Sequence, residues 1–212
     1  MFNFYFKTSN QHARWWANRK IDWDAHYLQT WNHPHRELIV QVLKSLGGWV
    51  SLWEVGCGPG PNLVKITKEM PGHQLGGSDI NPDAIELARK TFVGAKFNVN
   101  PIDDVLLSDG SVDIVLSDAA LIYVGPRKIR GAIKEIVRIA RNHVVLCEFH
   151  GGTWWSRFWL RVRNGYNAYD YKKLLEEAGC YDIQVGKIPK EYWEGFPWQP
   201  WGYIIIAKVT KL

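Results

Sequence analysis

The sequence has little cysteine and no long apolar run. Its three cysteines, Cys57, Cys147 and Cys180, are far apart and form no C-x-x-C pair, so neither a disulfide framework nor a thiolate metal site is expected. No stretch of about 18 apolar residues occurs, which argues against a membrane-spanning helix. The first residues also lack a basic region followed by a long apolar core. We therefore expect a cytoplasmic protein with reduced, mostly buried cysteines.

The composition also lacks the bias of a disordered chain. Hydrophobic residues make up 46% and charged residues 22% of the 212 residues, which are ordinary globular values. We expect one large domain, with or without an extension. The net charge is +5 at pH 7, but residues 127–163 hold nine Lys or Arg against two Glu. One side of the molecule is therefore expected to be basic.

What the sequence has is a regular alternation of short apolar runs and helical patterns. The apolar runs predict strands at residues 49–55, 74–80, 95–99, 112–117 and 143–149. Patterns of helical spacing separate them, the clearest at residues 126–141, and a further helix is expected within 33–48. Such alternation is typical of β-α-β units, and it predicts a parallel sheet with helices on both faces.

The two ends of the chain break this alternation. After a helical pattern at 169–179, strands are predicted at 181–187 and 203–209, and the prolines and glycines between them do not suit a crossover helix. Without such a helix, these two strands should pair antiparallel. Residues 1–35 are rich in aromatic side chains without a clear period. We interpret them as an extension or lid on a domain that spans 36–212.

A glycine-rich loop follows the first predicted strand, in the sequence WEVGCGPGPNL at residues 53–63. Open α/β folds bind ligands at this edge of the sheet, and glycine lets a ligand approach the backbone. Glu54 ends the strand, where a carboxylate repels a pyrophosphate and attracts a cation. Asp79 ends the second strand, where it can accept both hydroxyls of a ribose. A nucleoside with a positively charged group fits both acids, and a purely structural turn is the alternative.

At these residues the sequence resembles the class I S-adenosylmethionine-dependent methyltransferases. EVGCGPG is similar to the first motif of that family, SDINPDAIELAR to the second, and IDDVLLSDGSVDIVLSDAALIYV to the stretch across the third and fourth strands. The resemblance covers about residues 49–149. It implies a Rossmann-like fold with a seven-stranded, mostly parallel sheet and an antiparallel C-terminal strand. It also implies S-adenosyl-L-methionine as the cofactor and S-adenosyl-L-homocysteine as its product.

The resemblance also implies roles for individual residues. Glu54 and the first two loop glycines would line the methionine end, Asp79 would hold the ribose, and Ile80 would pack on the adenine. The aspartate that usually receives the adenine amine is replaced by Pro101, so its neighbours are the candidates for that contact. Ser117 and Asp118, which end the fourth strand, would face the methyl group and substrate. The full set of candidate cofactor residues is Glu54, Gly56, Cys57, Gly58, Gly60, Asn62, Asp79, Ile80, Asn100, Ile102, Asp103 and Ser117.

A catalytic base is needed only if the acceptor atom carries a proton, because the methyl donor is already activated. Candidates at the carboxyl edge of the sheet are Asp118, Tyr123 and His150, with His33 and His35 available from the extension. The two histidines of the extension could instead cap the following helix. No third ligand with recognisable spacing accompanies them, so no metal site is expected.

The acceptor is less constrained than the cofactor. SDAA after the fourth strand departs from the Asn or Asp, Pro-Pro and aromatic pattern of amino-methylating DNA enzymes, so DNA is not expected. The stretch GGTWWSRFWLRVRNGY suits a hydrophobic acceptor, an anionic membrane surface or stacked RNA bases, unless its tryptophans simply cover the sheet. We expect a small-molecule acceptor of apolar or aromatic character. An RNA or protein methyltransferase that uses residues 127–163, and a non-catalytic binding module, are the alternatives.

Overall fold

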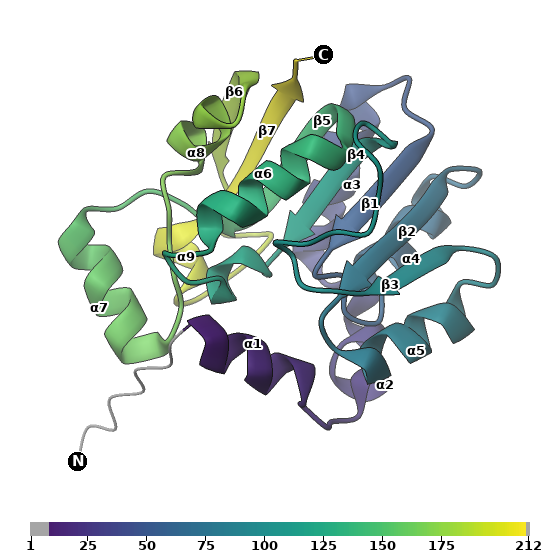
Figure 1. The fold of residues 1–212 in the computed structure, drawn as a ribbon, viewed down its shortest axis with the longest axis horizontal. Helices are drawn as coiled ribbons and strands as arrows, with labels where there is room; N and C mark the ends of the chain where they lie inside the picture. Colours follow the sequence, from purple (N-terminus) through teal and green to yellow (C-terminus); the bar gives the residue numbers. More distant parts are fainter. Residues whose placement is uncertain (1–8, 211–212) are drawn as a thin grey trace.

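The structure is a computed structural model that describes residues 9–210. Residues 1–8, with the aromatic side chains predicted to belong to a lid, and residues 211–212 lie outside the described part. At its centre is a seven-stranded sheet (Figure 1). Its strands are β1 (Ser51–Val55), β2 (Gln74–Asp79), β3 (Lys96–Val99), β4 (Val112–Asp118), β5 (Ala140–Phe149), β6 (Cys180–Lys187) and β7 (Gly202–Val209).

The strand order is β3-β2-β1-β4-β5-β7-β6. The first five strands of this order pair in parallel, and β7 is antiparallel to both β5 and β6. The predicted fold class is therefore confirmed. The connection from β6 to β7 contains only the short helix α9 (Trp198–Trp201), so the chain returns as a hairpin rather than a crossover, as the prolines and glycines predicted.

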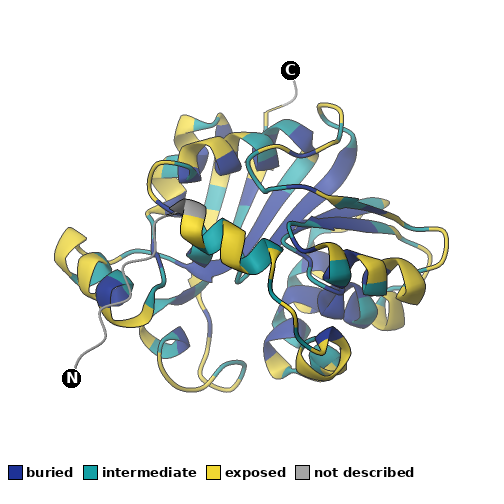
Figure 2. Cartoon of the chain, turned by 60° about the horizontal axis from the view of Figure 1, so that its bottom comes forward, coloured by how far each residue is buried: buried dark blue, intermediate teal, exposed yellow. Residues whose placement is uncertain are grey.

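Helices cover both faces of the sheet, and each face has its own core. Successive strand residues point to opposite faces, so Leu52 and Ile114 join one cluster while Trp53 and Val115 join the other. Figure 2 shows the buried strands between these two layers. The larger helices are α3 (Pro34–Leu46), α4 (Pro61–Glu69), α5 (Pro82–Thr91), α6 (Ile129–Ile139), α7 (Trp154–Asn164) and α8 (Tyr171–Glu177).

The helix α3 brings chemistry-bearing side chains to the carboxyl edge of the sheet. Pro34 occupies its first turn, where a missing N–H costs nothing, and His33 is its N-cap. Gly47, with φ of +52°, ends the helix in a backbone conformation that glycine adopts readily. One side of α3 packs into the core through Ile39 and Leu43. This packing fixes the two residues that follow Pro34 at the sheet edge.

The segment before α3 crosses that same edge of the sheet (Figure 1). It consists of α1 (Ser9–Ala17), α2 (Trp23–His26) and the 3-10 helix η1 (Leu28–Asn32). The amide of Asn81 donates to the backbone oxygens of Trp16 at 2.7 Å and Arg19 at 3.0 Å, while its oxygen caps α5. One buried side chain thus ties the extension to the loop that follows β2. Within residues 9–210, no helix has both the length and the apolar character needed to cross a bilayer.

Candidate active site

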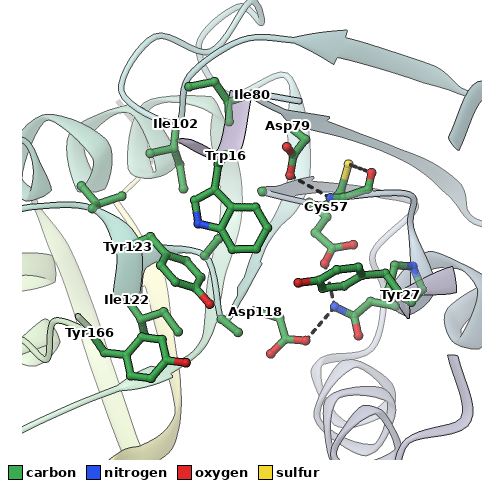
Figure 3. A pocket seen from close by; sticks show the side chains of 18 of the residues that line it. Trp16, Tyr27, Cys57, Asp79, Ile80, Ile102, Asp118, Ile122, Tyr123 and Tyr166 are labelled. Atoms are coloured by element: carbon green, nitrogen blue, oxygen red, sulfur yellow. Dashed lines mark hydrogen bonds between the residues drawn. The ribbon is translucent and has the colours of Figure 1, made fainter. Parts of the chain in front are cut away.

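A cavity of about 430 Å³ lies where β1, β2 and β4 end. The loops after these strands form its floor, and the extension and the β6–β7 connection form its walls. Figure 3 shows aromatic and acidic side chains from these separate segments pointing into one space. The carboxyl edge predicted from the sequence is therefore the edge that carries a cavity.

The three loop glycines serve different purposes. Gly58, with φ of +53°, lines the cavity, and a Cβ there would have no atom within 4 Å. A Cβ at Gly56 would lie 2.3 Å from the Cβ of Ala120, so Gly56 allows the loop after β4 to approach. Gly60 does not line the cavity, and a Cβ there would lie 2.8 Å from the ring of Phe92. Only Gly58 leaves open backbone toward a ligand, and the other two are required by packing.

Two buried acids stand on either side of this loop. Glu54 is 1% exposed, and its Oε1 accepts from Asn62 Nδ2 at 2.6 Å. Its Oε2 is buried with no hydrogen-bond partner among the described residues, and burial raises the pKa of Glu54 to about 8. Asp79 accepts from the N–H of Gly58 at 2.9 Å and of Asn81 at 2.8 Å. These bonds moderate the rise in the pKa of Asp79 that its burial causes.

A chain of hydrogen bonds links the end of β4 to the start of α3. Asp118 Oδ2 lies 2.9 Å from His35 Nε2, and His35 Nδ1 lies 2.5 Å from His33 Nδ1. Asn62 Nδ2 also donates to Asp118 Oδ2 at 2.9 Å, and the ring of Trp193 stacks on His35 at 3.9 Å. His33 also caps α3, by accepting from the N–H of His35 at 3.4 Å. Both interpretations of the histidines, site and cap, therefore describe this structure.

The charge states of these hydrogen-bonded side chains follow from their burial and from the charges beside them. Burial alone would raise the pKa of Asp118, but the charge and hydrogen bond of His35, with the charge of Arg36, hold that pKa below its usual range. Burial and the neighbouring His35 lower the pKa of His33 to about 4, so its ring is neutral at pH 7. Arg36 is 7% exposed and lines the cavity, and its Nε has no hydrogen-bond partner in the described chain.

The opposite end of the cavity holds the residues next to Pro101. Asn100 is 7% exposed, and its Oδ1 is buried without a partner among residues 9–210. The carboxylate of Asp103 is paired with Lys128 at 2.7 Å. Ile80 and Ile102 add apolar surface (Figure 3). Of the three residues considered as substitutes for the missing aspartate, Asn100 alone presents an unused, buried acceptor.

Aromatic side chains enclose the space between these two ends. Figure 3 places Trp16 of α1 between Asp79 and Tyr123, and the rings of Trp16 and Tyr123 meet edge to face at 4.9 Å. Burial, together with the neighbouring Tyr166, raises the pKa of Tyr123. Tyr123 is therefore a neutral phenol at pH 7 and is unsuited to the role of base that the sequence suggested.

Three predicted site residues lie outside the cavity. Ser117 is fully buried and donates to Glu148 at 2.8 Å. His150 accepts from the N–H of Tyr171 at 3.2 Å and does not line the cavity, because the strand turns it toward α8. Gly60 is the third, as described above. The other predicted residues, Glu54, Gly56, Cys57, Gly58, Asn62, Asp79, Ile80, Asn100, Ile102, Asp103, Asp118 and Tyr123, all line the cavity.

Glu148, which no sequence pattern singled out, shapes the loop after β4. Its fully buried carboxylate accepts from Ser117 Oγ and from the N–H groups of Ala120, Leu121 and Ile122, at 2.8 to 3.2 Å. An acid inside the apolar run at 143–149 was the available signal, since buried carboxylates need several donors. Arg36 and Trp16 were also missed, because helical periodicity does not tell which polar residue of a helix faces a cavity.

The sheet order, the glycine turn and the acid at the end of β2 define a Rossmann-like nucleotide-binding fold. Residues 53–143 match the family described as "Methyltransferase domain". A magnesium protoporphyrin IX methyltransferase from Synechocystis PCC 6803, solved with bound S-adenosylhomocysteine, superposes with a TM-score of 0.63 at 16% identity, over 97% of this chain and 96% of that chain. The same enzyme has also been solved with bound S-adenosylmethionine.

Two curated relatives are similar in sequence. The human thiol S-methyltransferase TMT1B is 29% identical over 83% of this chain and 78% of its own length. The trans-aconitate 2-methyltransferase of Rhodococcus jostii is 25% identical, and the match spans 60% of this chain and 56% of that protein. Residues 53–143 thus carry a methyltransferase domain, and the similarity to the named methyltransferases supports an S-adenosylmethionine-dependent enzyme of class I.

Proposed function

We propose that this enzyme methylates a small acceptor of apolar or aromatic character, held in the aromatic part of the cavity. The cofactor supplies a methyl group already activated on a sulfonium centre. Its amino acid end fits the buried groups without partners: the ammonium would lower the raised pKa of Glu54, so that Oε2 accepts from it as a carboxylate oxygen, and Arg36 can donate to the carboxylate of the cofactor. Opposite charges in a dry site attract strongly, which favours this orientation.

The nucleoside end of the cofactor fits the other half of the cavity. Asp79 still has lone pairs for the ribose hydroxyls after accepting its two backbone N–H groups. The buried Oδ1 of Asn100 can accept from the adenine amine, and Ile80 and Ile102 can pack on the ring. An amide oxygen thereby replaces the carboxylate usual in this family, so the loss of that aspartate does not imply a loss of cofactor binding.

The single observation that supports a small acceptor is the enclosure of the cavity. Side chains of the extension, such as Trp16 and Tyr27, close it on one side, and Trp193 and Trp198 of the β6–β7 connection close it on another. We interpret the extension as a lid, because such enclosure excludes water from a reactive methyl donor. Both curated relatives carry names that specify small acceptors, a thiol and trans-aconitate.

The hydrogen-bonded chain from Asp118 to His33 supplies a proton acceptor. His33 is neutral at pH 7, and in the tautomer whose proton is on Nδ1, facing His35, Nε2 can accept a proton from an acceptor O–H, N–H or S–H. That tautomer gives up the cap bond from the N–H of His35. The negative charge of Asp118 would stabilise the imidazolium that forms, in opposition to burial and to His35. Methyl transfer itself requires in-line positioning, which the enclosing rings provide.

Methylation of RNA or a protein is less well supported. Much of the basic stretch is engaged in ion pairs, as Arg138 pairs with Glu135 and Asp109, and Arg141 pairs with Asp113. A track for an anionic chain needs unpaired charge along a groove. Ion pairs leave the stretch fewer such charges than its composition suggests.

A panel of small thiols, phenols, amines and carboxylic acids, incubated with S-adenosylmethionine and the purified enzyme, tests this proposal through formation of S-adenosylhomocysteine. We expect His33→Gln to lower kcat by about 10² to 10⁴-fold with unchanged calorimetric affinity for S-adenosylhomocysteine. His143→Gln, on the distal part of β5, is the matched control and should change neither. Methylation of RNA or protein but of no small acceptor would overturn the proposal, and cofactor binding without any product would favour the non-catalytic module.

A further inference from the structure

The helix α7 carries exposed aromatic side chains that the proposed reaction does not use. Trp154 is 73% exposed, Trp155 52%, Phe158 41% and Trp159 37%. Their spacing places them on one side of the helix, and Leu160 on the other side is buried. Figure 1 shows α7 at the periphery of the molecule, away from the sheet. The alternative that these tryptophans cover the sheet is therefore wrong.

Leaving such a surface in water is costly. Full burial of one large apolar side chain is worth roughly 1.5 to 3 kcal/mol, and soluble proteins seldom expose several together unless the patch binds something. The four rings pack on one another: Trp155 stacks on Phe158 at 5.7 Å, and Trp154 meets Trp155 edge to face at 4.9 Å. They form a single apolar ridge rather than separate rings.

The charge beside this ridge has one sign. Arg161 and Arg163 lie in the last turn of α7, and Arg163 lies 5.0 Å from the ring of Trp159. The sequence has no Asp or Glu between Glu148 and Asp170. A helix with Trp and Phe on one side and arginine near its end has the composition of helices that lie in the interface of an anionic bilayer.

We propose that α7 is a membrane-docking helix, whose aromatic ridge enters the headgroup region of an anionic bilayer while Arg161 and Arg163 pair with lipid phosphates. The geometry favours lipid over RNA, because binding of single strands uses a basic groove with ring faces available for stacking. Here the four rings lie on a helix at the periphery of the molecule, and no basic groove is formed beside them by the described residues. A bilayer needs no pocket on the protein, so a projecting helix is sufficient for it.

The C-terminal end of α7 lies next to the cavity. Gly165 ends α7 in a left-handed conformation, and Tyr166, the next residue, lines the cavity and meets Tyr123 at 5.7 Å. A Cβ at Gly165 would lie 3.7 Å from the ring of His12, so α1 borders the same end of α7. A docked α7 would therefore hold the aromatic cavity close to the membrane, where apolar acceptors accumulate.

Sedimentation of the purified full-length protein with vesicles tests the proposal. We expect binding to vesicles of phosphatidylcholine mixed with phosphatidylserine, weaker binding to phosphatidylcholine alone, and a decrease with salt. The double variant Trp154→Ser/Trp155→Ser should lose at least tenfold in affinity. Arg161→Gln and Arg163→Gln should each lose about fivefold on the anionic vesicles, because one arginine near such a surface contributes about 1 kcal/mol.

The matched control removes apolar side chains that are exposed elsewhere. Val93 and Leu106 are 94% and 63% exposed, and Val93→Ser/Leu106→Ser should bind vesicles as the wild type does. Equal affinity for S-adenosylhomocysteine in all variants shows that each is folded. Absence of vesicle binding, or equal binding by the α7 double variant, would overturn the proposal. The proposal would also be overturned if the protein did not bind vesicles but bound polyuridylate, or self-associated, through α7.

Discussion

Replacement of Glu148 tests how the loop after β4 is held. In Glu148→Gln one oxygen keeps acceptor character, while the new NH2 group faces donors that have no other partner. Burial raises the pKa of Glu148, but three of its four partners are backbone N–H groups, which can only donate and which favour the carboxylate form. Hydrogen bonds to a charged group contribute about 1.5 to 3 kcal/mol each, and a buried donor without a partner costs about 1 to 3 kcal/mol. Relief of desolvation offsets part of the loss, so we expect a net destabilisation of about 2 to 4 kcal/mol.

Denaturant unfolding followed by circular dichroism measures this change, with calorimetry of S-adenosylhomocysteine binding as the second readout. The free energy of unfolding should fall, and the affinity should fall with it, because the same loop carries Asp118 and Ala120 to the cavity. Glu86→Gln is the matched control, since Glu86 forms only an exposed i,i+4 pair with Lys90 and should change stability by less than about 0.5 kcal/mol. A Glu148→Gln protein within 0.5 kcal/mol of wild type would refute this account of the loop.

Two further predictions concern the lid and the acid limit of stability. Asn81→Ala should lower the free energy of unfolding by about 2 to 3 kcal/mol and speed proteolysis within residues 9–20, because it removes a helix cap and both bonds to the extension. Asn81→Asp keeps the cap acceptor and should lose mainly the protection of the extension from proteolysis. Equal protection in the wild type and Asn81→Asp would contradict the role of the amide. The folded pKa of Asp118 lies below its unfolded value of about 3.9, so its contribution is present above that pH and is lost as the pH falls below it. The Asp118→Asn variant should therefore have a lower free energy of unfolding at pH 7, and that free energy should fall less steeply between about pH 4 and 2. An unchanged slope against pH would contradict the contribution of the buried Asp118–His35 pair.

The sheet and the cofactor half of the cavity could be predicted because their signals are local. The glycine loop lies next to β1 in the sequence and Asp79 ends β2, so reading strand ends was enough to place both at one edge. The same logic assigned the hairpin of β6 and β7, since prolines and glycines between two apolar runs leave no helix. These features depend on residues within a few positions of each other.

The rest of the site depends on contacts between segments distant in the sequence. His35 and Asp118 are 83 residues apart, and Asn81 reaches Trp16 across 65 residues. The spacing of apolar residues in the sequence does not predict such long-range contacts. His150 was placed at the edge correctly by its position after β5, but which way its ring turns depends on its contact with α8. Burial, which raises the pKa of Tyr123, likewise depends on side chains from distant segments.

The division of the cavity between these two kinds of segment bears on specificity. The half in which we propose the cofactor binds is formed by loops of the sheet, whose backbone is fixed by strand pairing and by Glu148. The half in which we propose the acceptor binds is lined by α1 to α3 and by residues 193–198, and Asn81 is one of the side chains that hold α1 to the sheet. Changes in these segments can alter the shape of the acceptor space without moving the glycine loop or Asp79. If the proposed placement of the acceptor holds, the sequence of the extension and of the β6–β7 connection, rather than the motif region, encodes the acceptor preference.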